Sequence, residues 1–344
     1  MKTHKKPANG RQASLKIIAE QTGVSMMTVS RTLRGLNSVA PKTAAKIRKV
    51  AESLRYRPNK LVEGLRTGRT GMIAAVLPTT LGFYEEALRS IESSLDKLNC
   101  SLILNMVAQD FGQDAMREEL RRLHRCIDLR VDGVILRPVN DDANAVYFNE
   151  VMERGMPLVV IDRKLPDFEC DFVGTDDRSG GGAAARKLLS AGCRHLALLH
   201  AGTRISTSRE RREGFLAATQ NSGASVCELD CGSFLADPAQ LAGFFESGAA
   251  KSVDGIFAVG DLLARDTIQV LKGLGRECPR DFKVLGFGRL LLNDPSSVRL
   301  ATFDQHPGQI GEEAVRLLMD RLDNPGKPPR SVHLPAAFVA GETL

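Results

Sequence analysis

From residue 70 onward the sequence alternates between short apolar runs and amphipathic stretches of helical spacing, and no other feature limits the possible folds as strongly. Stretches such as EEALRSIESSLDKL and REELRRLHRCIDL carry apolar residues on one helical face. The apolar runs between such stretches include MIAAVLP, CSLILNMV, VDGVILRPV, MPLVVIDR, HLALLH, VDGIFAVG and FKVLGFG. Short strands separated by amphipathic helices predict parallel α/β sheets that are covered on both faces.

Two such units follow each other, at about 70–172 and 173–302, and a tail supplies one more helix and one more strand. The sequence therefore predicts a body of two lobes, each built on a doubly wound parallel sheet. Ligands in this fold class bind beyond the carboxyl ends of the strands. Residues that directly follow the apolar runs are thus the first candidates for a binding site.

The 344 residues carry a net charge of +6, but this charge is unevenly distributed. Residues 1–69 contain 16 Lys and Arg against three Glu, a balance of +13, and the remaining residues contain 31 against 38, a balance of −7. A small basic head on an acidic body indicates a polyanionic partner for the head, because Lys and Arg neutralise phosphates and release counterions. A solvated basic tail would explain residues 1–13 alone.

The rest of the head is patterned as three short helices. A first helical pattern ends at Gly23, Ser25 can cap a second helix, and a third helix begins near Pro41. The spacing of Ala19, Gly23 and Val29 is typical of a helix-turn-helix. In that motif a small residue lets the helices approach, the glycine turns the chain, and Val29 packs the second helix onto the first.

The segment YRPNKLVEGLRTGRTG follows the head and predicts a hinge. Pro58 can begin a short helix, but Gly64 weakens it, so that this helix is only marginally stable by itself. A marginal helix between two folded units indicates a segment that folds or unfolds with its surroundings.

These motifs, in this order, resemble the LacI family of bacterial transcriptional repressors. The patterns GVS..TVSR.L, V...T...I...A..L.YRPN and LRTGRT succeed one another, and the resemblance continues to near the C-terminus. It implies an N-terminal arm and helix-turn-helix headpiece at 1–56, a hinge at 57–69, and an effector-binding and dimerisation domain at 70–344.

The resemblance further implies that the body is a periplasmic-binding-protein-like clamp, whose lobes close on a small effector and whose late helix returns to the first lobe. Lobe 1 would cover about 70–172 plus 304–328, and lobe 2 about 173–303 plus 329–344.

The second helix of the head would read DNA according to this resemblance. Arg31 would reach a guanine edge or a phosphate, and the two methionines would offer flexible apolar contact, for instance to a thymine methyl group. In the hinge, Leu65 would wedge between base steps of the minor groove; the alternative is an ordinary apolar linker residue. The residues that would face DNA are Ser25, Met26, Met27, Thr28, Ser30, Arg31, Asn59 and Leu65.

The resemblance also places effector-contacting residues after the strands of the body, where the alternative for a lone arginine is a solvated surface position. These residues are Phe83, Tyr84, Arg137, Asp162, Arg163, Arg209, Phe234, Asp261 and Arg289. Phe234 would stack on a sugar ring or a base. The chain departs from the family at Gly260, where a side-chain amide is common, and at Gly288 and Arg289, where acidic residues are common.

The acidic side chains that would accept hydrogen bonds from neutral hydroxyl groups are missing at these positions, and Arg289 adds a positive charge. The sequence therefore predicts a cationic cavity, and arginine binds carboxylates and phosphates bidentately. We therefore expect an anionic effector, namely a sugar acid such as gluconate or a ketogluconate, with a sugar phosphate as second choice. The sequence as a whole predicts a cytoplasmic repressor that acts as a homodimer on a pseudopalindromic operator. The alternative is a soluble α/β sugar-binding or sugar-processing protein with an incidental basic head.

Enzymatic chemistry is not expected. Asp176 and Asp177 precede the glycines at 180–182, but neither GxGxxG order nor a Walker lysine-serine pair is present. We interpret these glycines as allowing a helix N-terminus to pack against a neighbouring strand. Seven scattered cysteines without a CxxC pair indicate reduced thiols rather than a metal site, and no apolar run is long enough to span a membrane. The sequence thus predicts no catalysis, cofactor, metal or membrane partner.

Overall fold

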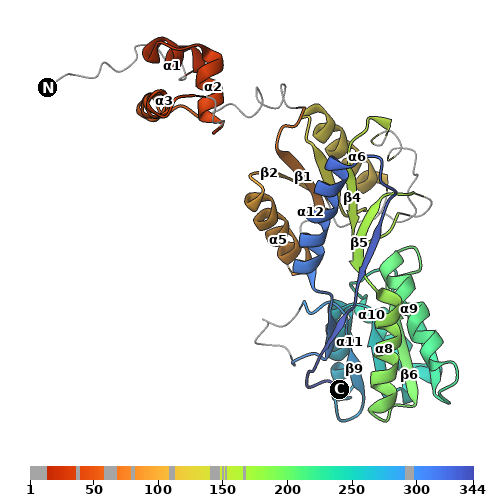
Figure 1. The fold of residues 1–344 in the computed structure, drawn as a ribbon. Helices are drawn as coiled ribbons and strands as arrows, with labels where there is room; N and C mark the ends of the chain where they lie inside the picture. The colour runs from red at the N-terminus through yellow and green to blue at the C-terminus, as the bar shows by residue number, and fades with distance from the viewer. Residues whose placement is uncertain are drawn as a thin grey trace. The chain divides into compact units, whose positions relative to one another are not determined.

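The computed structural model describes residues 14–35, 39–57, 68–78, 82–107, 113–139, 148, 151, 153–165, 168–290 and 298–344. The chain divides into two compact units, Met1–Thr70 and Gly71–Leu344. The described part of the first unit is helical, and the second unit contains the described strands (Figure 1).

The first unit contains the three helices that the sequence predicts. They are α1 (Leu15–Thr22), α2 (Met26–Leu33) and α3 (Pro41–Ser53). Gly23 ends α1 with a left-handed φ of 73°, and its N–H donates to the carbonyl oxygen of Ala19 over 2.9 Å. Ile18, Val29 and Ile47, one from each helix, are fully buried against one another. The predicted inward position of Val29 is thus confirmed.

Lobe 1 of the second unit is built on a six-stranded parallel sheet with the strand order β11-β5-β4-β3-β1-β2. Its strands are β1 (Met72–Pro78), β2 (Ser101–Val107), β3 (Gly133–Leu136), β4 (Leu158–Ile161), β5 (Asp171–Thr175) and β11 (Ser331–Leu334). Its helices are α5 (Phe83–Lys97), α6 (Gln113–Asp128) and α12 (Pro307–Asp323).

Alternation along β1 explains why both faces of this sheet are covered. Ile73 and Ala75 face the core formed with α5 and α12, whereas Ala74 and Val76 face the core formed with α6 (Figure 1). All four side chains are fully buried. A strand that is buried on both faces carries a continuous apolar run, which is why the run MIAAVLP could be recognised.

Lobe 2 is built on a four-stranded parallel sheet with the order β7-β6-β8-β9. Its strands are β6 (His195–His200), β7 (Ser225–Asp230), β8 (Gly255–Ala258) and β9 (Lys283–Leu285). Its helices are α8 (Asp177–Ser190), α9 (Ser206–Thr219), α10 (Pro238–Glu246), the 3-10 turn η1 (Gly248–Ser252) and α11 (Asp261–Gly273). Helices α8 and α9 cover one face, and α10 and α11 cover the other. The predicted architecture of two doubly wound lobes is therefore confirmed.

Three passages of the described chain connect the lobes. The first follows β5, the second links β10 (Thr302–Asp304) to α12, and the third links β11 to β12 (Ala337–Val339), which pairs antiparallel with β10. The late helix α12 lies in lobe 1, as the resemblance implies. Because β5 and β11 belong to the lobe 1 sheet, lobe 1 extends to Thr175 and to Leu334, a few residues beyond the limits taken from the sequence.

The glycines of α8 permit a close helix–helix crossing, where the sequence suggested a neighbouring strand. A Cβ atom at Gly181 would collide with the backbone carbonyl of Arg211 in α9, and one at Gly214 would collide with the carbonyl of Arg178 in α8. Gly180 lies against the ring of Phe287, which a Cβ atom would approach to 2.7 Å. Helix α8 thus packs on helix α9, and not only against a strand, with the backbones in direct contact at the glycines.

We expect the substitution Gly181→Ala to lower the free energy of unfolding of the body by about 1–3 kcal/mol, because two helix backbones would have to separate. Gly243→Ala in α10 is the matched control, since a Cβ atom there has no neighbour within 4 Å. That change should be neutral or stabilise by about 0.5–1 kcal/mol. Urea denaturation of both variants checks this, and equal stabilities would contradict the close crossing.

Candidate functional site

The start of α2 presents an exposed surface in the first unit. Ser25 caps the helix, since its Oγ accepts the N–H of Thr28 over 3.1 Å. Met26 and Met27 are 55% and 64% exposed, while Val29 is fully buried. The methionines therefore face outward and are not part of the core of this unit.

The remaining candidates of this helix lie around the same surface. Arg31 is exposed, and Thr28 and Ser30 are half-buried. Lys46 of α3 donates its Nζ to the carbonyl oxygen of Thr22 over 3.0 Å and so ties α3 to the end of α1. The hinge candidates Asn59 and Leu65 lie outside the described residues.

A cavity of about 220 Å³ lies in the second unit, beyond the carboxyl ends of strands from both sheets. Seven of the residues proposed from the sequence line it, namely Phe83, Tyr84, Arg137, Asp162, Arg163, Phe234 and Asp261. Residues that the sequence reasoning missed complete the wall, among them Thr207, Arg211, Ser233, Phe287, Leu290 and Gln305.

On the lobe 1 side, three polar side chains hold one another in place. The Nε of Arg137 donates to the Oη of Tyr84 over 2.9 Å, and that hydroxyl donates to Oδ2 of Asp162 over 2.5 Å. Burial raises the pKa of Tyr84 to about 12, so the phenol stays protonated and keeps donating. Asp162 has a left-handed φ of 66°, a conformation that non-glycine residues rarely adopt.

Arg137 retains binding capacity despite its burial. The residue is 3% exposed, and its Nη1 has no hydrogen-bond partner among the described residues. Neighbouring Arg163 is equally buried and donates its Nη1 to the carbonyl oxygen of Val139 over 3.1 Å. Burying a cationic donor without a partner costs free energy, and an anionic ligand would satisfy that donor.

On the lobe 2 side, each of the three guanidinium nitrogens of Arg211 donates a hydrogen bond within the protein. Its Nε donates to Asp177 over 2.7 Å, its Nη1 to the carbonyl of Val259 over 2.7 Å, and its Nη2 to Oε1 of Gln305 over 2.8 Å. The guanidinium also lies 3.9 Å above the centre of the Phe287 ring. Burial raises the pKa of Asp177 to about 7, although the charge of Arg211 opposes this shift.

Asp261 at the start of α11 is also satisfied within the protein. Its two carboxylate oxygens accept hydrogen bonds from the Oγ1 of Thr302 over 2.5 Å and from the N–H of Leu290 over 2.7 Å. Burial raises its pKa to about 6. The residue lines the cavity, but its bonds serve to hold the segment after β9.

Two predicted cavity residues lie elsewhere. Arg209 donates its Nη1 to the carbonyl of Thr203 over 3.0 Å and does not line the cavity. Helical spacing would have identified the better candidate, because Thr207 and Arg211 are four residues apart and share one face of α9, from which Arg209 is turned away.

Arg289 is the second predicted cavity residue that lies elsewhere. It pairs with Asp304 over 2.5 Å, whereas its neighbours Gly288 and Leu290 line the cavity. The cationic character expected from Arg289 is therefore supplied by Arg137 and Arg163.

Metal-ligand clusters and membrane-spanning helices are both absent from the described part of the chain. No group of three or more His, Cys, Asp and Glu side chains there could hold a metal ion. No helix among these residues is both long enough and apolar enough to span a bilayer.

Comparisons with known proteins cover both units. Residues 14–59 match the family described as bacterial regulatory proteins, lacI family, and residues 185–344 match the periplasmic binding protein-like domain. The regulator DegA of Bacillus subtilis is 28% identical over 309 residues, covering 87% of this chain and 88% of its own. The ribose operon repressor of Halalkalibacterium halodurans is 23% identical over 331 residues, covering 96% of each chain.

A solved structure shares the fold. The lac repressor dimer bound to operator and an anti-inducer superposes with a TM-score of 0.80 at 20% identity, covering 97% of this chain and 99% of that one.

We expect Arg137 and Arg211, two of the three arginines that line the cavity, to contribute unequally to stability. Arg211→Met should lower the free energy of unfolding by about 3–5 kcal/mol, because it leaves Asp177 buried without its partner. This loss should shrink at low pH, where that carboxyl is protonated. Arg137→Met should cost less, because Tyr84 keeps its bond to Asp162 and the change also removes a buried donor with no partner among the described residues. Urea denaturation at two pH values measures both, and equal losses would contradict the assignment.

Proposed function

Since the chain belongs to the LacI family of bacterial regulatory proteins, we propose that it is a transcriptional repressor that binds a pseudopalindromic operator as a homodimer, under the control of a small anionic effector. The chain is a DNA-binding regulator and not an enzyme. The observation that carries the proposal is the exposed, capped start of α2 on a basic head. The alternative, a sugar-binding protein with an incidental head, is not favoured because the head itself matches the regulator family.

In the proposed DNA complex, α2 reads the major groove. Met26 and Met27 contact base edges through their apolar surface, and Arg31 reaches a guanine or a phosphate. Thr28 and Ser30 lie near phosphates and fix the position of the helix. Asn59 and Leu65 would act in the minor groove from the hinge.

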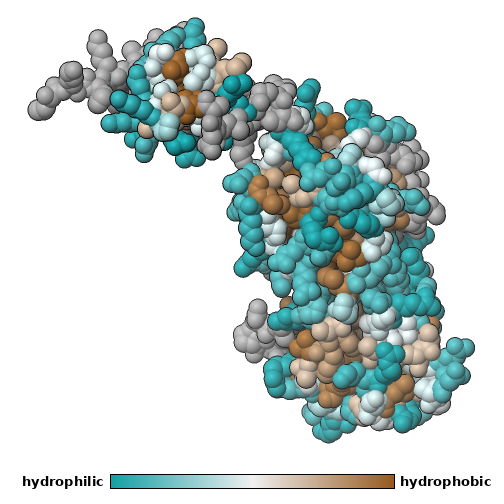
Figure 2. All heavy atoms as spheres, viewed as in Figure 1, coloured by the Kyte–Doolittle hydropathy of each residue, from teal (hydrophilic) through white to brown (hydrophobic). Residues whose placement is uncertain are grey.

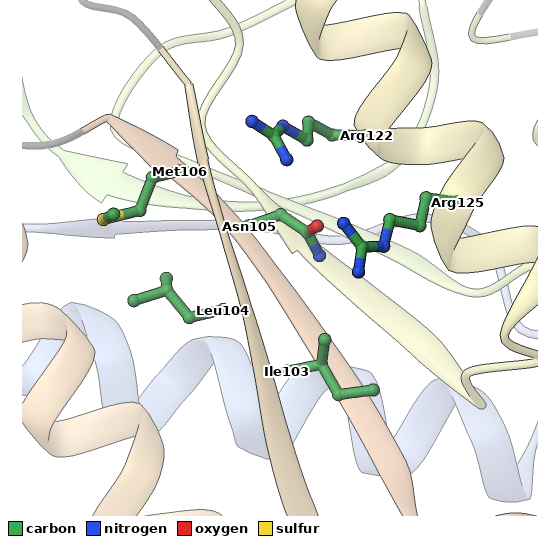
Figure 3. A pocket seen from close by; sticks show the side chains of 6 residues that line it. All are labelled: Ile103, Leu104, Asn105, Met106, Arg122 and Arg125. Carbon is green, nitrogen blue, oxygen red and sulfur yellow. The ribbon is translucent and has the colours of Figure 1, made fainter.

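The edge of the lobe 1 sheet supports the proposal of a homodimer. Among the described strands, β2 pairs only with β1, and its Leu104 and Met106 are 42% and 52% exposed. Figure 3 shows these two side chains on one side of β2, with Asn105 turned to the other side, toward Arg125 of α6. In the view of Figure 2, apolar residues reach the surface over β2. An edge strand with exposed apolar side chains is a template for pairing with another chain.

The effector would bind in the cavity between the two lobes. An anion is supported by the unmatched Nη1 of Arg137, with Arg163 beside it. These buried cations fit the carboxylate of the sugar acids expected from the sequence, gluconate or a ketogluconate. The proposed regulator would act in the cytoplasm, where its operator lies.

DNA binding tests the central proposal. The full-length protein should shift a subset of genomic fragments, with an affinity that falls steeply as salt rises, because phosphate contacts release counterions. The double variant Met26→Gln/Met27→Gln should keep its stability, since exposed substitutions usually change it by less than about 0.5 kcal/mol, but should select different fragments. Val29→Ala is the control, because it removes core packing and should weaken binding to all fragments alike. If the double variant selected the same fragments as the wild type, Met26 and Met27 would not contribute to sequence recognition.

The oligomeric state tests the proposed interface. Met106→Glu should increase the dissociation constant of the dimer by roughly tenfold or more, because a charge would be buried without a partner. Val298→Glu is the matched control, since Val298 of lobe 2 is exposed to a similar degree, 42%, and lies away from β2. Sedimentation velocity over a concentration series measures both; a monomeric wild-type protein, or equal dissociation of the two variants, would count against the interface.

A further inference from the structure

The two ends of the cavity offer different chemistry to a ligand. At the lobe 1 end, the buried Nη1 of Arg137 has no partner among the described residues, and Asp162 is bound by Tyr84 through one of its two oxygens. At the lobe 2 end, the charged groups that line the cavity are already engaged: Arg211 makes three hydrogen bonds within the protein, and both oxygens of Asp261 accept one. Polar recognition is therefore concentrated on lobe 1.

At the lobe 2 end, apolar side chains lie beside Gly260 and Gly288, two positions that carry no side chain of their own. A Cβ atom at Gly260 would lie 2.7 Å from Cδ1 of Phe234, so the ring occupies the space that a side chain at 260 needs. At Gly288 a Cβ atom would lie 3.4 Å from Cγ of Leu290, and the φ of 129° there is one that only glycine adopts readily.

The same leucine also reaches the other lobe. A Cβ atom at Gly82 would lie 2.5 Å from Cδ2 of Leu290. Gly82 and Gly260 thus make room for Leu290 and Phe234, which together with Phe287 form an apolar wall of the cavity.

We infer that the lobe 2 end of this cavity receives a C–H surface, so that the effector is a carboxylate whose far end is a ring or a deoxygenated chain and not a row of hydroxyl groups. The carboxylate binds Arg137, and the apolar end lies against Phe234 and Leu290. Thr207 and Ser233 can serve one or two hydroxyl groups at the margin. This inference rests on the proposed function, because it takes the cavity to be the effector site.

The physical reason is the cost of burying a hydroxyl group without a partner. A polyhydroxylated acid would have to place several hydroxyl groups against aromatic and aliphatic carbon, where they lose their bonds to water and gain none. A C–H surface loses nothing there and gains from leaving water. An apolar pocket rejects one added hydroxyl group by up to about a hundredfold, and gluconate carries several.

Four probes separate charge from hydroxylation. Calorimetric titration of the full-length protein would use cyclohexanecarboxylate, D-gluconate, D-glucose and cyclohexanol. We expect cyclohexanecarboxylate to bind at least roughly tenfold more tightly than gluconate, and both neutral probes to bind more weakly than the carboxylate of the same kind. Arg137→Met should weaken binding of the cyclic carboxylate by roughly tenfold or more.

Two further variants test the wall itself. Phe234→Ala should weaken binding of cyclohexanecarboxylate by roughly tenfold and leave gluconate nearly unchanged, because only the former buries a C–H face on the ring. Arg209→Met is the control and should bind all probes like the wild type, since Arg209 does not line the cavity.

The outcomes distinguish this inference from the proposed function. Tighter binding of gluconate than of the cyclic acid, abolished by Arg137→Met, would overturn the apolar end and leave an anionic effector standing. If glucose bound most tightly of the four probes, both the apolar end and the anionic effector would be contradicted. Failure of both carboxylates to bind at millimolar concentration would also overturn the inference, while salt-dependent shifting of genomic fragments by the same sample would still support a DNA-binding regulator.

Discussion

The hydrogen bonds of Arg211 hold together the part of the body on which the cavity depends. One guanidinium joins the start of α8 through Asp177, the end of β8 through Val259, and the passage between β10 and α12 through Gln305. Gln305 also accepts from Thr175 at the end of β5, over 3.3 Å. Two of the three passages between the lobes are therefore fixed to one buried cation. The glycine crossing of α8 and α9 brings Arg211 close enough to reach them.

This arrangement separates the arginines of the cavity into two kinds. Each guanidinium nitrogen of Arg211 donates to an acceptor within the protein, so its charge is balanced without a ligand. Arg137 is held in position through Tyr84 and Asp162 but keeps one buried donor unmatched. A buried donor without a partner reduces stability and is retained where binding requires it. The chemistry of recognition is thus concentrated on Arg137, although Arg211 is the arginine with more contacts.

The sequence predicted the features that depend on local pattern. Apolar runs and their helical spacers identified both sheets, and the family resemblance pointed to Tyr84, Arg137 and Asp162, which line one cavity. Features that depend on contacts between distant segments were not predictable. The pairing of Arg289 with Asp304 joins the segment after β9 to the end of β10, and the ring of Phe234 over Gly260 cannot be read from either residue alone. The limits of lobe 1 differ from those expected for the same reason, because only the pairing of strands shows that β5 and β11 belong to the lobe 1 sheet.

The unequal ends of the cavity also bear on how an effector could act. A ligand shifts an equilibrium between two lobe arrangements only as far as its affinities for them differ. A ligand held entirely by lobe 1 would bind open and closed arrangements alike and would change nothing. A carboxylate on Arg137 whose apolar end needs Phe234 and Leu290 is fully bound only when both lobes meet it. Because each lobe binds a different end of the ligand, the ligand has the differential affinity that regulation requires. Gln305 and Thr175 lie at the passages where the lobes would move.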